Sequence, residues 1–183
     1  MSDLDLIRRI TGADLPLELI DGNRFEDFKK RRPKYVGPRE LRSSKRLLIS
    51  ENFARCQGIS FLDKGGQIGA LAHIFVTYNP YRFLTGQMNG RYIENPERIF
   101  EDMERVSVVH VYHEGNYEWS KADISCALKR IGIERVVHIP IKSKPGRRPY
   151  RHIVNDVEEG SVYVFPTDFD FGIKYCPDSA SKE

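Results

Sequence analysis

The sequence predicts one domain of the α/β (α+β) class, in which helices cover a mixed, largely antiparallel β-sheet. Three observations support this: short apolar runs that alternate with period two, turn residues between them, and segments with apolar residues at helical spacing. With 183 residues, the chain can bury a core without disulfides or metal. We therefore expect a sandwich of sheet and helices.

We expect residues 1–45 to form an N-terminal basic extension. Ser2 is a candidate cap for a short helix that Gly12 ends, and residues 24–32 can form a second helix before Pro33. Ten Lys or Arg and three acids fall within residues 24–46. Because no clear period continues beyond Asp14, we expect an irregular arm on the main domain.

The sequence pattern changes after Arg46, where predicted strands and helices follow one another with short connections. Glycines after Asp63 favour a tight hairpin, and a helix starts at Asn95, which precedes a proline. A strand, helix and strand over residues 106–141 form a β-helix-β passage. The other expected elements are strands at 47–49, 56–62, 68–76, 150–156 and 161–165, and a long loop at 77–93.

Composition excludes several classes of function. No apolar run is long enough to span a bilayer and acids occupy the start of the chain, so we expect a cytoplasmic protein without membrane insertion. Cys56, Cys126 and Cys176 match no zinc spacing and are expected to be free thiols. His110 and His113 would face opposite sides of a strand, so we expect no metal. The sequence indicates no cofactor.

The hairpin places a cysteine near a histidine. If the turn is centred between Lys64 and Gly65, Cys56 and His73 lie directly opposite each other on one face. An imidazole in that position can take the proton of a thiol that attacks an amide carbonyl. The alternative is that both are structural core residues, and position alone leaves it open.

The segments Cys56–Asp63, Lys64–Gln67 and Ile68–His73 resemble the active-site hairpin of the CheD chemoreceptor glutamine deamidases. The likeness extends over residues 46–165, with a Gly-Arg segment at residue 146 and a closing hairpin; residues 166–183 form a tail outside it. The resemblance implies a CheD-like catalytic domain that converts protein glutamine to glutamate and ammonia.

The resemblance also implies roles for particular residues. Cys56 would be the nucleophile, His73 would transfer protons, and Ser50 would orient His73, since the family has a threonine six positions before its cysteine. Backbone N–H groups of Arg55 and Cys56 would stabilise the oxyanion. Ala54-Arg55 stands where the family usually has Gly-Ser, which leaves open whether this chain is catalytic.

Partners are expected to be proteins. The substrate would carry an accessible glutamine, as on chemoreceptor-like helices, and a regulatory protein could dock on the basic loop through Arg147, Arg148 and Arg151. We do not expect nucleic acid, because no recognised motif is present. The alternative function is an inactive CheD-like module that docks an acidic protein or nucleic acid through its basic patches.

Overall fold

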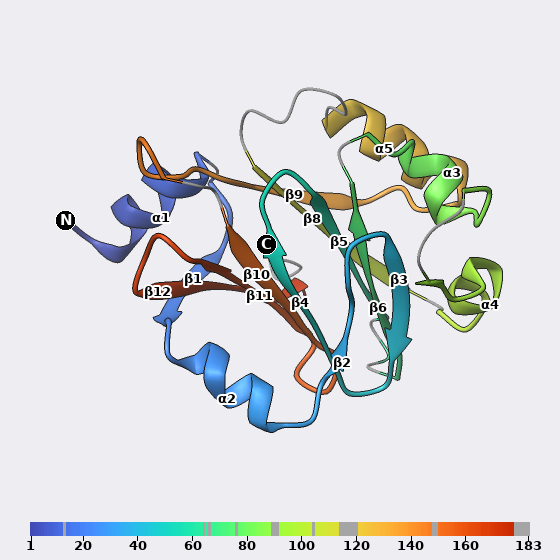
Figure 1. Cartoon of the computed structure of the whole chain (residues 1–183), viewed down its shortest axis with the longest axis horizontal. Coiled ribbons are helices and arrows are strands. Elements are labelled where there is room, and N and C mark those ends of the chain that lie inside the picture. Colours follow the sequence, from blue (N-terminus) through green and yellow to red (C-terminus); the bar gives the residue numbers. More distant parts are fainter. Residues whose placement is uncertain are drawn as a thin grey trace.

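The computed structural model describes the chain except residues 13, 64, 66, 76, 89–91, 104, 114–120, 148–149 and 178–183. Its described elements form four layers (Figure 1). Helix α2 (Arg24–Lys30) covers one sheet, a second sheet packs on the first, and three helices cover the far side: α3 (Pro80–Leu84), α4 (Pro96–Glu101) and α5 (Lys121–Arg130). The expected α/β sandwich is confirmed.

The first sheet, sheet A, has the strand order β1-β12-β11-β10-β4-β2. Its neighbours are antiparallel except for β2 and β4. The bounds are β1 (Leu17–Asp21), β12 (Phe171–Tyr175), β11 (Ser161–Pro166), β10 (Arg151–Asp156), β4 (Leu47–Phe53) and β2 (Lys34–Tyr35).

The second sheet, sheet B, has the order β7-β3-β6-β5-β8-β9. Strands β8 and β9 are parallel and joined through α5, which confirms the expected β-helix-β passage; β3 and β7 are also parallel. The bounds are β7 (Tyr92–Ile93), β3 (Glu40–Ser44), β6 (Gly69–Ile74), β5 (Gln57–Asp63), β8 (Val106–His113) and β9 (Val136–Ile141).

The local signals for helix ends are found where the sequence places them. Helix α1 (Asp3–Thr11) has a capping box between Ser2 and Asp5, and it ends at Gly12 with φ of 60°. Asn95 caps α4 by accepting the N–H groups of the first turn. In the described residues no helix is long and apolar enough to cross a membrane.

Alternation along each strand separates two environments. The interior between the sheets, which we call the inter-sheet core, holds side chains such as Leu48, Leu71 and Ile153. Asn155 of sheet A ties the sheets together, because its Nδ2 donates to Phe61 O at 3.0 Å and Ala70 O at 2.9 Å on sheet B. The opposite, outer face of sheet B packs against α3, α4 and α5.

Two regions contain more regular structure than expected. The predicted extension 1–45 contributes β1 and β3, and the predicted tail contributes β12, which pairs with β1. Partners so far apart in sequence leave no local signal. The expected loop at 77–93 contains α3, which begins at Pro80 with Asn79 as its cap. The boundaries at residues 45 and 165 stay predictions.

Candidate active site

The hairpin of β5 and β6 has a register two residues away from the predicted one. Gly58, not Cys56, lies opposite His73, and the Asp63 N–H donates to Ile68 O at 3.1 Å. The connection thus spans four residues rather than two. The predicted direct pairing was wrong, and Cys56 lies diagonally from His73, for which about 7–8 Å is typical. Cys56 still packs against the inter-sheet core, the layer that holds His73.

Ser50 and His73 meet inside that core, and both are fully buried. Ser50 Oγ lies 2.9 Å from His73 Nδ1 and 2.5 Å from the carbonyl oxygen of Val36. A carbonyl can only accept, so the single hydroxyl proton of Ser50 goes to Val36. Ser50 therefore accepts from Nδ1–H of His73, and Nε2 keeps its lone pair. Among the described residues, Nε2 has no hydrogen-bond partner.

A β-bulge positions an aromatic ring over His73. Between β4 and β10 the register shifts, and Asn52 has φ of 60°, so two residues of β4 oppose one of β10. The extra residue turns Phe53 to the same face as Ser50. Its ring stacks on His73 with centroids 3.8 Å apart. Gly58 leaves space for this packing, because a Cβ there would lie 2.2 Å from Ile153 Cδ1 and 3.2 Å from Phe53 Cε1.

Arg151 supports the segment that carries the cysteine. Its Nη2 donates to Cys56 O at 2.7 Å, and its Nη1 lies 3.4 Å from the carbonyl oxygens of Phe53 and Ala54. Its side chain is fully buried, so the predicted docking role of Arg151 was wrong. Alternation could have indicated this, because Arg151 shares a strand face with the core residue Ile153.

The same contacts bear on the predicted oxyanion donors. In a planar trans peptide the C=O and the following N–H point in opposite directions. Because Ala54 O faces Arg151, the N–H of Arg55 points away from that guanidinium.

Burial keeps both members of the candidate pair uncharged. Burial raises the pKa of the Cys56 thiol to about 11, although the charge of Arg151 opposes the rise. Burial, then the charge of Arg151, lowers the pKa of His73 to about 3, against a smaller opposite effect of Glu40. Both groups are therefore neutral near pH 7, and any proton transfer between them has to accompany attack on a substrate.

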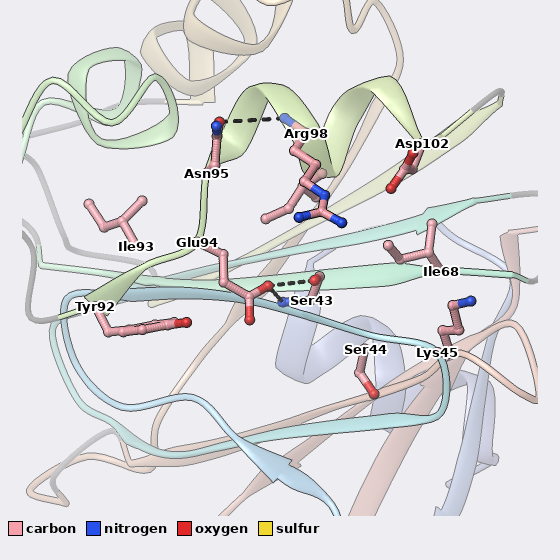
Figure 2. Close-up of a pocket in the computed structure, with 11 residues that line it drawn as sticks. Ser43, Ser44, Lys45, Ile68, Tyr92, Ile93, Glu94, Asn95, Arg98 and Asp102 are labelled. Atoms are coloured by element: carbon pink, nitrogen blue, oxygen red, sulfur yellow. Dashed lines mark hydrogen bonds between the residues drawn. The ribbon is translucent and has the colours of Figure 1, made fainter.

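Large pockets lie away from this pair. One of about 560 Å³ separates β3 from α4, and Figure 2 shows the Glu94 carboxylate directed at Ser43 on its floor. Across the pocket, Arg98 of α4 and Asp102, the residue that follows the helix, point toward the strands. Cys56 itself is partly exposed, whereas the His73 side chain is sealed. Access to the candidate pair is therefore through the Cys56 side.

The remaining predicted residues lie apart from this pair. Arg147 is exposed, and Arg148 lies outside the described residues. Cys126 is exposed, and Cys56 and Cys176 are partly exposed; all are free thiols. His110 and His113 have different partners, since His110 contacts His138 and His113 contacts Ser143. The described part of the chain holds no group of three or more metal-ligating side chains.

Comparisons with known proteins leave the family open. No family model matches the chain, and no curated protein matches it. Among solved structures, a Neisseria meningitidis protein of the family DUF152 aligns with a TM-score of 0.42 and 10% identity, over 83% of this chain and 78% of that one. A likeness this distant assigns neither family nor activity. The resemblance to CheD is not confirmed by these comparisons.

Proposed function

We propose that the protein is a cysteine-dependent amidohydrolase that deamidates glutamine side chains of a protein substrate. One observation carries the proposal: Nε2 of His73 is a buried base that has no hydrogen-bond partner in the part of the chain that the structure describes. Ser50 sets its tautomer, and it lies in the layer against which Cys56 packs. A buried polar atom without a partner is costly, and such sites are often functional. The CheD resemblance of the hairpin supports glutamine as the substrate.

The reaction uses neutral partners. As Cys56 Sγ bonds to the carboxamide carbon, its proton moves to His73 Nε2, and N–H groups near Arg55 stabilise the oxyanion. The imidazolium then protonates the amide nitrogen as the C–N bond breaks and ammonia leaves. Water attacks the thioester, gives a proton to Nε2, and releases glutamate while the sulfur regains that proton. His73 ends neutral, as it began.

The local structure has to open slightly for this chemistry, because His73 is sealed by Phe53. Substrate binding at the partly exposed Cys56 would exclude water and bring thiol and base together. Burial raises the pKa of Cys56 to about 11, and the charge of Arg151 opposes part of this rise, so the guanidinium favours the thiolate character that develops during attack.

The direct test is ammonia release from glutamine-bearing helical proteins, with mass spectrometry to find the converted residue. We expect Cys56→Ala to abolish release while Cys126→Ala, the matched control, retains it. Thermal unfolding checks that both variants are folded. Release from Cys56→Ala at the native rate would exclude Cys56 as the nucleophile.

The competing function is a docking module without chemistry, and the raised pKa of Cys56 favours it. Alkylation by iodoacetamide separates the two. If a glutamine-bearing substrate or its non-hydrolysable mimic speeds alkylation or acylation of Cys56, the hydrolase is supported. If Cys56 stays slower than exposed Cys126 with every candidate substrate, the docking function is the better account.

A further inference from the structure

A chain of hydrogen bonds crosses the outer face of sheet B beneath α5. His110 of β8 and His138 of β9 are direct neighbours in the parallel pair, and their Nδ1 atoms lie 2.9 Å apart. His110 Nε2 lies 2.8 Å from Gln57 Oε1, and Ser125 Oγ lies 3.0 Å from His138 Nε2. Side chains from β5, β8, β9 and α5 thus form one continuous path, separate from Cys56.

The donors and acceptors along these hydrogen bonds follow from the amide of Gln57 at one end. The oxygen of Gln57 only accepts, so Nε2 of His110 carries the proton. Burial holds the pKa of His110 well below its usual value, so the ring is neutral and its Nδ1 accepts from Nδ1–H of His138. Burial also lowers the pKa of His138, whose Nε2 then has a lone pair. The Ser125 hydroxyl must therefore donate to His138.

The hydrogen-bond chain ends at Ser125, which lies in the wall of a pocket. Ser125 and His138 both line a hollow of about 570 Å³, within the range of small-molecule sites. Apolar strand residues form much of its wall, and Arg135 adds a guanidinium of the kind that stabilises an oxyanion. The apolar strand residues are Val106, Val108, Val136 and Val137.

We propose that Ser125 is a second nucleophile, which reacts with small carboxylic esters in this pocket, with His138 as its base and His110 as the residue that positions His138. A hydroxyl that donates to an imidazole, which in turn donates to a third group, is the arrangement that activates serine in hydrolases. The proposal goes beyond the amidohydrolase function and does not depend on it.

The reaction balances with these groups and water. Ser125 Oγ bonds to the acyl carbon as its proton moves to His138 Nε2, and the imidazolium then protonates the ester oxygen as the C–O bond breaks and the alcohol leaves. Water then attacks the acyl-serine, gives a proton to Nε2, and releases the acid while Ser125 regains its proton. Because His110 is neutral, it stabilises the imidazolium less than a carboxylate would, so we expect slow turnover.

A fluorophosphonate probe tests the nucleophile without knowledge of the natural ester. Attack by Ser125 Oγ forms an O–P bond and expels fluoride, which leaves an adduct that peptide mass spectrometry locates. We expect Ser125→Ala to remove this adduct, and His138→Gln to slow labelling by about ten-fold or more. Hydrolysis of p-nitrophenyl acetate should fall in parallel.

Matched controls keep the result interpretable. Ser143→Ala changes another serine that lies beside a histidine, His113, but outside this pocket, and it should label at the native rate. Ser125→Ala should preserve α5, because alanine favours helices, so a lost adduct would not reflect unfolding. Labelling should also persist in Cys56→Ala, which separates this site from the cysteine chemistry. The proposal is overturned if Ser125 gains no more adduct in the folded chain than in urea, or if His138→Gln labels at the native rate.

Discussion

Each face of sheet B carries a histidine that meets a serine of a neighbouring layer, Ser50 of β4 on the inner face and Ser125 of α5 on the outer face, and the two hydroxyls have opposite roles. On the inner face, Ser50 gives its proton to the Val36 carbonyl and accepts from His73. On the outer face, Ser125 donates its proton to His138. The same two residue types therefore orient a base in one place and supply an activated hydroxyl in the other.

The difference comes from the third partner in each set. A backbone carbonyl takes the proton of Ser50, so this hydroxyl cannot also donate to the imidazole. In the outer pair, the second histidine accepts from Nδ1 of His138 and leaves its Nε2 for Ser125. Burial reinforces the contrast, because Ser50 is sealed in the core whereas Ser125 lines a pocket.

The largest loss of stability is expected for a substitution of Arg151, which holds the backbone near the inner pair of Ser50 and His73. Arg151→Met removes the donors to the carbonyl oxygens of Phe53, Ala54 and Cys56. We expect the free energy of unfolding to fall by about 3 kcal/mol, since buried acceptors without donors cost about 1–3 kcal/mol each and relief of charge burial offsets part of the loss. Urea unfolding measures it.

Arg151→Lys is the companion variant, because it keeps the charge but not the planar fork. The lysine charge should keep the pKa of Cys56 lower than in Arg151→Met, so alkylation of Cys56 should begin at a lower pH than in that variant. Equal stability of Arg151→Met and the native chain would show that the inner site does not depend on this contact network.

The sequence predicts the inner site in outline but not its register. A slip of two residues keeps every side chain on its face, so the hydrophobic pattern of β5 and β6 cannot separate Cys56 from Gly58 as the partner of His73. Only the length of the turn decides this. Ser50, by contrast, came from the spacing of the family resemblance, and its Oγ lies 2.9 Å from His73 Nδ1, while its role in orienting His73 stays a prediction.

The outer site was not predictable from local patterns. His110 and His138 are 28 positions apart and meet only because β8 and β9 are adjacent and parallel, which depends on the path of the whole β-helix-β passage. Ser125 was merely one polar position of an amphipathic helix. Asn52 was the missed local signal for the bulge that turns Phe53 inward, since asparagine is enriched at positive φ.

A second, smaller effect is a pH dependence of stability that originates in His73. Its pKa is about 3 in the folded chain, below the usual 6.5 that applies when unfolded. The unfolded state therefore gains a proton as pH falls through 6.5 while the folded state does not, so stability is full above that pH and decreases toward pH 3. At pH 5 the loss attributable to His73 is about 2 kcal/mol.

His73→Gln isolates this contribution, because glutamine can still donate to Ser50. We expect the variant to lose less stability than the native chain between pH 7 and pH 5, as measured by urea unfolding at each pH. His138→Gln is the matched control on the outer face, and its pH dependence should differ less from native because His138 lines an open pocket. Identical pH slopes for His73→Gln and the native chain would contradict a buried neutral His73.

The smallest effect separates the two serines directly. Ser50→Ala leaves the Val36 carbonyl without its donor and Nδ1–H of His73 without its acceptor, inside a sealed core, so we expect a loss of about 1.5 kcal/mol in the free energy of unfolding. Ser125→Ala should cost about 0.5 kcal/mol, because water in the pocket can replace the hydroxyl as donor to His138. Urea unfolding of both variants at pH 7 gives the comparison. A larger loss for Ser125→Ala than for Ser50→Ala would mean that the outer hydroxyl, and not the inner one, stabilises the fold. Ser125 would then be a structural residue and not a reactive nucleophile.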